Sequence, residues 1–178
     1  MKGDIMNNEV LENIKTRRSI RKFKSDPIEK EVLDKIIEAG TYAPSGKNRQ
    51  SAIIIAITNK EVLDKLAQIN AEVINLNKKT MYDAPAVLVV LGNKDISTYV
   101  QDGCAVLENM LLAAHSLGVG SCWVHRAKEE FETEYGKELL KSLNIEGNYE
   151  GIGHCLLGYP LEEGHLFARK DNYVYYID

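Results

Sequence analysis

The chain has 178 residues, of which 44% are hydrophobic and 27% charged, with 22 Lys and Arg against 26 Asp and Glu. This composition excludes a disordered protein, and the length predicts a single domain over residues 1–178. The net charge of −4 argues against a nucleic-acid binder, and the longest apolar run, residues 84–92, is too short for a membrane span of about 20 residues. Three cysteines without a C-x-x-C pair, and no visible secretory signal, favour a cytoplasmic protein.

The first half of the chain predicts alternating helices and strands. A short helix is expected over residues 9–17, a longer one over 29–42 after Pro27, a loop over 41–50 and a helix over 59–66, followed by a second polar helix over 71–79. The β-branched run 52–57 predicts a strand buried on both faces, and residues 86–91 predict another buried strand.

The segment 97–117 predicts the central helix of the protein. It is apolar on more than one face, so we expect another subunit to cover part of it. Gly103 would let a neighbouring backbone approach, and Gly118 is a natural helix C-cap. Strands are expected at 121–124 and 152–157 with a helix over 131–143 between them, and the tail 172–177 has strand propensity. The pattern predicts one α+β domain around a small sheet.

A basic segment is the best candidate for an anion site. Residues 15–24 contain six basic side chains and no acid, whereas the rest of the chain carries 16 basic and 26 acidic groups. Arg17, Arg18, Ser19 and Arg21 offer guanidinium and hydroxyl donors for a phosphate, and in an extended segment Ser19 and Arg21 would share one side while Ile20 faces the core. The alternative is a solvated basic face or a nuclear-localisation-like run.

Two glycine-containing loops fail as nucleotide motifs. Residues 40–48 resemble a Walker A loop, but five residues separate the glycines, Asn48 replaces the magnesium-binding hydroxyl, and the loop follows a helix. Ser45, Asn48 and Gln50 remain as polar groups on a constrained loop, or as parts of an ordinary turn. Residues 118–123 lack the third glycine of a dinucleotide fingerprint, although their small residues would let backbone N–H groups approach a planar ligand.

A metal site and a protein nucleophile are both disfavoured. Cys122, His125, His154 and Cys155 are the only possible ligand set, but His154 and Cys155 are adjacent in an expected strand and would face opposite sides. Buried cysteines in strands are usually small hydrophobic residues. No paired carboxylates, G-x-S-x-G or H-E-x-x-H motif is present. We therefore predict no metal and name no catalytic residue.

Four segments together resemble the FMN-dependent nitroreductase family, and they arrive in that family's order: 17–23 (RRSIRKF), 43–50 (APSGKNRQ), 118–123 (GVGSCW) and 158–160 (GYP) followed by Arg169. The resemblance implies that Arg17, Arg18, Ser19 and Arg21 hold the FMN phosphate, ribityl chain and pyrimidine edge, with Arg169 returning to the same phosphate. It also implies that Pro44, Ser45 and Asn48 reach the flavin from the partner subunit, and that Gly120 and Ser121 lie near the isoalloxazine ring.

The same resemblance implies an intertwined homodimer of an α+β fold, with a small mixed or antiparallel sheet flanked by helices and a flavin at the interface. NADH or NADPH would pass a hydride to the flavin, which would reduce an organic acceptor such as a nitroaromatic or quinone. Arg21 would favour the negatively charged reduced flavin. Many relatives continue the second motif with Pro and an aromatic residue, whereas this chain has Ser51 and Ala52. A non-enzymatic flavin carrier or regulatory module is the alternative function.

Overall fold

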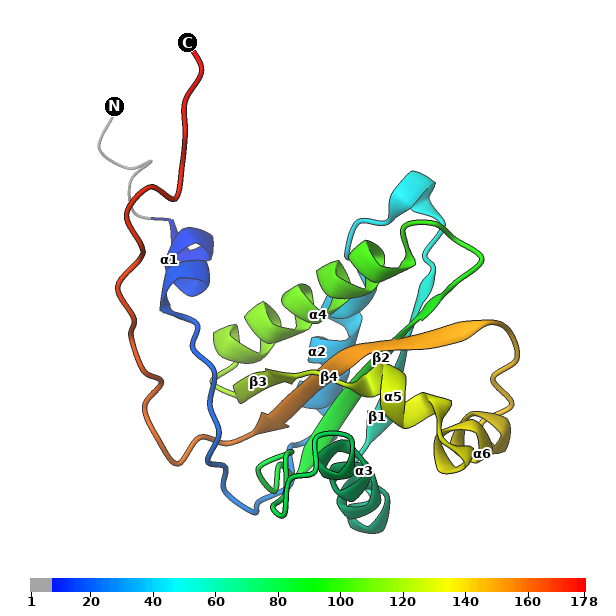
Figure 1. Ribbon diagram of the computed structural model, residues 1–178. Helices are drawn as coiled ribbons and strands as arrows, with labels where there is room; N and C mark the ends of the chain where they lie inside the picture. Colours follow the sequence, from blue (N-terminus) through cyan, green and yellow to red (C-terminus); the bar gives the residue numbers. More distant parts are fainter. Residues whose placement is uncertain (1–7) are drawn as a thin grey trace.

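The computed structural model describes residues 8–178 as an antiparallel sheet with helices on both faces (Figure 1). The four strands are β1 (Ala52–Ile57), β2 (Ala86–Asn93), β3 (Gly120–Val124) and β4 (Tyr149–Gly158), in the order β1-β2-β4-β3. All three strand pairs are antiparallel, and the register between β2 and β4 shifts at Val90/Leu91. The α+β class and the small sheet expected from the sequence are therefore confirmed.

Six α-helices and one 3₁₀ helix are found within residues 8–178. They are α1 (Glu9–Thr16), α2 (Lys30–Thr41), η2 (Gly46–Asn48), α3 (Lys60–Glu72), α4 (Tyr99–Ser116), α5 (Ala127–Glu132) and α6 (Glu134–Ser142). None of these helices is long and apolar enough to cross a membrane. All three cysteines lie outside disulfide bonds.

The core has two halves, one on each face of the sheet. On one face, Leu66 of α3 and Phe131 of α5 pack against Val89 of β2. On the other face, α2 and α4 cover the sheet, and Leu107 and Met110 of α4 are completely buried. Both faces of β2 and β4 are thus covered, which explains why the sequence of β2 reads as a nearly continuous apolar run.

Four expectations about the elements were wrong in detail. The strand β1 lies at the edge of the sheet and its Ala56 is exposed, so it is not buried on both faces. The second polar helix over 71–79 is absent because Ala71 belongs to the buried face of α3, which ends at Glu72. The expected helix 131–143 is divided at Thr133, whose extended backbone and side chain cap the start of α6. The tail 172–177 pairs with no strand among the described residues 8–178.

The helix α4 carries a face that the protomer leaves uncovered. Its side toward the sheet is buried, whereas Val100 in its first turn and Leu117, the C-cap residue just after it, are each 40% exposed. Gly103 allows the close approach of the Ile152 side chain, since a Cβ there would lie 2.6 Å from Ile152 Cγ1, so the neighbour is a side chain rather than a backbone. Gly118 adopts a φ of +71° after the end of α4, as expected for a helix C-cap.

Candidate functional site

The basic segment leaves α1 as an extended strand-like chain beside β3. Ser19 forms a parallel bridge with Ser121, and the Ile20 backbone N–H donates to the Ser121 carbonyl at 2.9 Å. The Ile20 side chain is buried, as the alternation predicted, so the residues on either side of it turn away from the core. The fold thereby fixes the direction in which Ser19 and Arg21 project.

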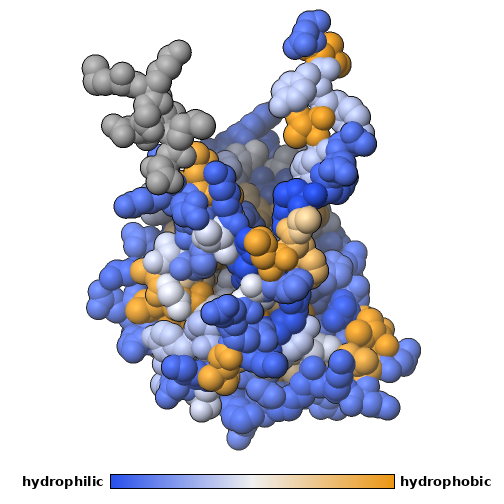
Figure 2. Space-filling view, turned by 90° about the vertical axis from the view of Figure 1, so that its left-hand side faces the viewer, coloured by the Kyte–Doolittle hydropathy of each residue, from blue (hydrophilic) through white to orange (hydrophobic). Residues whose placement is uncertain are grey.

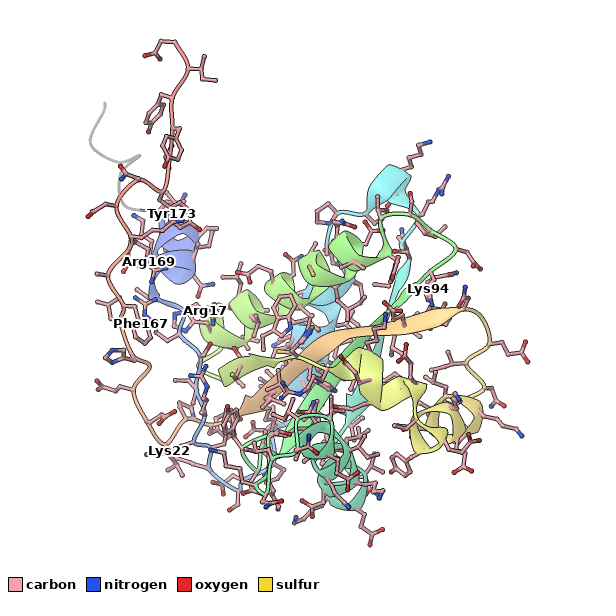
Figure 3. All side chains as sticks on the ribbon, in the orientation of Figure 1. Arg17, Lys22, Lys94, Phe167, Arg169 and Tyr173 are labelled. Atoms are coloured by element: carbon pink, nitrogen blue, oxygen red, sulfur yellow. The ribbon has the colours of Figure 1, made fainter. Side chains whose placement is uncertain are left out.

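A recess of about 570 Å³ lies between α1, this extended segment and the C-terminal segment. Five of its ten lining residues are Lys or Arg and none is acidic; they are Ile14, Lys15, Arg17, Arg18, Ser19, Arg21, His165, Leu166, Phe167 and Arg169. Figure 3 shows Arg17, Phe167 and Arg169 together on this side of the molecule. The face that carries them is hollowed, with hydrophobic side chains beside strongly hydrophilic ones (Figure 2).

The arginines of this basic recess differ in how far they are already engaged. The Arg18 guanidinium donates to the carbonyls of Lys15 and Arg17 at 2.6 and 2.7 Å, so it closes the C-terminal end of α1. The Arg21 guanidinium lies 6.0 Å from the centre of the Tyr82 ring. Within residues 8–178, no hydrogen bond or ion pair engages the Arg17 guanidinium. The same holds for the Arg21 guanidinium, so Arg17 and Arg21 both keep their N–H donors available to a ligand.

A second recess of about 440 Å³ adjoins the basic one, because Arg18 and Leu166 line both. Gly120 and Ser121 line it from β3. A Cβ at Gly120 would lie 3.1 Å from the Gly158 carbonyl and from Ile20, so glycine permits the tight packing of these segments. Ser121 is only 2% exposed and its carbonyl already accepts from the Ile20 N–H, so it contributes little surface of its own to the recess.

His115 also lines this second recess. Its Nε2 lies 2.9 Å from the Thr16 hydroxyl, which ties the last turn of α4 to the end of α1. Burial, reinforced by the positive charges of Arg17 and Arg18, lowers the pKa of His115. The contact with Thr16 could not be predicted from the sequence, since the two residues are 99 positions apart.

The loop with Pro44, Ser45 and Asn48 lies elsewhere in the protomer. It connects α2 to β1 at the N-terminal end of α4, where Pro44 and Ser45 line a recess of about 420 Å³. The helix α1, which lines the basic recess, lies at the opposite end of α4 (Figure 1). The helix α4 has 18 residues and is therefore about 27 Å long. A single flavin nucleotide is too short to span that distance. One protomer therefore brings together the arginine and glycine groups but not the loop.

A buried carboxylate that the sequence analysis missed anchors this loop. Asp102, in the first turn of α4, is 5% exposed and accepts hydrogen bonds from the Gly46 backbone N–H and the hydroxyls of Ser51 and Thr98. Burial acts to raise the pKa of Asp102, but these hydrogen bonds outweigh it and lower the pKa below its usual value. An acidic residue in a helix's first turn is so common that the signal was not specific.

The cysteine and histidine set does not assemble into a metal site. No group of three His, Cys, Asp or Glu suited to a metal ion occurs among residues 8–178. His154 is fully buried, with Nε2 2.9 Å from a Glu130 carboxylate oxygen and Nδ1 3.1 Å from the Val124 carbonyl. The Cys155 thiol is fully buried as well, and burial raises its pKa far above the usual range. His154 and Cys155 therefore belong to the core.

The fold and the two adjoining recesses define an α+β protein that presents a cluster of arginines beside a glycine-containing edge strand. The sequence matches the nitroreductase family over residues 14–79 and 74–159. The chain belongs to the nitroreductase family.

Relatives and solved structures agree with this assignment. A provisionally named NADH dehydrogenase/NAD(P)H nitroreductase of Archaeoglobus fulgidus is 34% identical over 170 residues, which cover 93% of each chain. An NADPH-flavin oxidoreductase of Vibrio harveyi is 31% identical over 94% of this chain and 72% of its own. A nitroreductase of Bacteroides fragilis with bound FMN has a TM-score of 0.86 and 29% identity, covering 97% of this chain and 100% of that one.

Proposed function

We propose that residues 1–178 form one FMN-binding domain that transfers electrons from NADH or NADPH to a small organic acceptor such as a nitroaromatic or a quinone. Family membership makes the protein a flavin oxidoreductase, with FMN as cofactor and NAD(P)H as reductant. Bound FMN would supply the redox chemistry, which accounts for the lack of a recognisable protein nucleophile or acid–base pair in the sequence. The acceptor and the roles of individual residues are part of the proposal.

The observation that carries this proposal is the charge of the basic recess. A phosphate monoester carries about −1.5 to −2 charges at pH 7, and guanidinium groups bind it through paired, charge-assisted hydrogen bonds. Five basic side chains with no acid in the recess lining fit such a group. We assign the phosphate to Arg17 and Arg169, with Arg18 and Ser19 toward the ribityl chain.

The adjoining recess fits the ring system of FMN. Its Gly120 and Ser121 are small residues, so no bulky side chain of this part of β3 would keep a planar ligand away. Arg21 lies on the same extended segment and would face the pyrimidine edge. In that position a permanent positive charge favours the anionic, reduced form of a flavin, and it would raise the reduction potential of the bound cofactor.

We further propose that the protein is a homodimer whose partner completes each flavin site with Pro44, Ser45 and Asn48. The separation of this loop from the basic recess supports a site shared between subunits. The exposed hydrophobic side chains support it too, because α1 buries none of its residues and the C-terminal tail exposes most of its aromatic surface. Contiguous apolar surface of this kind normally marks an interface. Gel filtration with light scattering would test it, and a monomer that binds FMN tightly would contradict it.

The decisive test compares FMN binding by three single variants that each remove one positive charge. Arg17→Ala and Arg169→Ala should weaken FMN binding by about tenfold or more, since hydrogen bonds to charged groups contribute about 1.5–3 kcal/mol. Lys22→Ala is the matched control: Lys22 belongs to the same basic run but lies outside the recess and is exposed (Figure 3). Equal losses in all three variants would mean that net charge, rather than the recess, attracts FMN.

A second measurement separates the enzyme from a flavin carrier. Purified protein loaded with FMN should oxidise NADH or NADPH steadily when a nitroaromatic or quinone is added. Protein that binds FMN but shows no such turnover with any acceptor would favour the carrier or regulatory function. Protein that is colourless and takes up no FMN would refute the proposal altogether.

A further inference from the structure

The loop that carries Ser45 and Asn48 has an unusual backbone. Lys47, Asn48 and Gln50 have φ angles of 54°, 53° and 49°, in the left-handed region. Residues with a side chain disfavour this region, and of these three only asparagine tolerates it readily. Lys47 and Gln50 are therefore strained there. A loop with two such residues keeps its shape only if surrounding contacts hold it.

The buried carboxylate of Asp102 supplies those contacts at both ends of the strained turn. One oxygen accepts from the Gly46 backbone N–H at 2.9 Å, just before the turn, and the other accepts from the Ser51 hydroxyl at 2.6 Å, just after it. The Thr98 hydroxyl donates to the second oxygen at 3.0 Å. Asp102 and Ser51 are each 5% exposed, so water competes poorly for these hydrogen bonds.

Steric fit restricts the same loop. A Cβ on Gly46 would lie 2.3 Å from the Thr98 hydroxyl oxygen, so the loop sits directly against the start of α4. Position 51 must also permit the left-handed backbone of Gln50. Serine permits it, whereas a proline there would hold the preceding residue in an extended conformation.

We propose that Asp102 and Ser51 are positioning residues: they hold Ser45 and Asn48, before any cofactor binds, in the conformation that meets the FMN of the partner subunit. The inference rests on the proposed function and adds two residues to its site. Neither residue needs to touch FMN. Their contribution is preorganisation, because a loop that is already ordered loses less conformational entropy when the ligand binds.

The test uses Asp102→Asn and Ser51→Ala in the full chain, with Glu61→Gln as control. Glu61→Gln makes the same carboxylate-to-amide change at an exposed position of α3. Hydrogen exchange of the FMN-free protein should be about tenfold faster over residues 44–51 in Asp102→Asn, with β2 and β4 unchanged. The Kd for FMN should rise about tenfold in the same variant, and by less in Ser51→Ala, which keeps the bond to Gly46.

The outcomes separate this inference from the proposed function. Unchanged hydrogen exchange and an unchanged Kd for FMN in both variants would overturn the inference. Hydrogen exchange that rises equally throughout the sheet would also overturn it, because that result indicates a general loss of stability. If Asp102→Asn fails to fold, Ser51→Ala decides by the same measurements. A wild-type protein that takes up no FMN refutes the proposed function, while the exchange of the FMN-free protein still tests whether Asp102 holds the loop.

Discussion

Replacing the buried Glu130 should destabilise the protein more than almost any other single polar substitution. Its carboxylate lies 2.9 Å from His154 Nε2 and also accepts from the Asn70 side-chain amide. Asn70 in turn accepts from the Arg126 guanidinium at 2.8 Å, so one network joins α3, the start of α5 and β4. Glu130 and His154 are both 0% exposed, which leaves no water to replace a lost partner.

Glu130→Ala should lower the free energy of unfolding by about 3–5 kcal/mol, the usual effect of removing one member of a buried, hydrogen-bonded pair. For a chain of this size the thermal midpoint should fall by about 6–20 °C. Glu130→Gln keeps one acceptor and should lose less, about 1–3 kcal/mol. Glu132→Ala, on the exposed side of the same helix, should change the free energy by less than about 0.5 kcal/mol.

Urea unfolding followed by circular dichroism gives these free energies. It should be done on FMN-free protein at one fixed concentration, because ligand binding and subunit association both raise apparent stability. A loss below about 1 kcal/mol for Glu130→Ala would refute the reasoning, since it would mean that the pair stabilises the folded state no better than a surface contact does. A loss equal to that of Glu132→Ala would have the same meaning.

Three further predictions concern backbone fit, acid stability and thiol reactivity. Gly151→Ala should lower the free energy of unfolding, measured in urea, by about 2–3 kcal/mol or more, because the added Cβ would lie 2.2 Å from a backbone carbon of α5. Gly118→Ala should lower it by only about 1–2 kcal/mol, the cost of a left-handed backbone at alanine. Equal losses in the two variants would contradict this reasoning. The hydrogen bonds to Asp102 lower its pKa below that of an ordinary aspartate, so its stabilisation is fully present above about pH 3.9 and is lost as the pH falls through the lower folded pKa. The acid limb of a stability–pH curve should therefore flatten in Asp102→Asn, and an unchanged limb would mean that the carboxylate is unimportant. Burial raises the pKa of the Cys104, Cys122 and Cys155 thiols, and only Cys104 is partly exposed. A chromogenic disulfide reagent should therefore label at most one thiol of the native protein, Cys104. Rapid labelling of Cys155 would disprove its burial.

The strands were predictable because their residues face buried surroundings on both sides of the sheet. The run from Ala86 reads as a strand for that reason, and the structure confirms it. The same pattern misled for β1, because a sequence does not state which strand lies at the edge. The boundary at Glu72 was missed since the residues after it are polar enough for a surface helix, and only the packing of α3 decides where the helix ends.

The shape of the candidate site was predictable only where its residues are neighbours in the sequence; their roles remain predictions. Arg17 to Arg21 form a continuous segment whose alternation fixes the burial of Ile20. The contacts that position other parts join distant residues: Asp102 meets Ser51 across 51 positions, and His115 meets Thr16 across 99. No local periodicity encodes such pairs, so they emerge only when the helices pack.

The length of α4 has a consequence for mixtures of subunits. If each flavin site takes its arginines from one chain and its loop from the other, an Arg17→Ala chain paired with an Asp102→Asn chain would form one wholly native site and one site altered on both sides. Co-expressed chains with distinguishable tags would then yield a mixed dimer in which half of the FMN binds with native affinity, although neither parent dimer binds it so tightly. Two altered proteins would restore a function that each has lost.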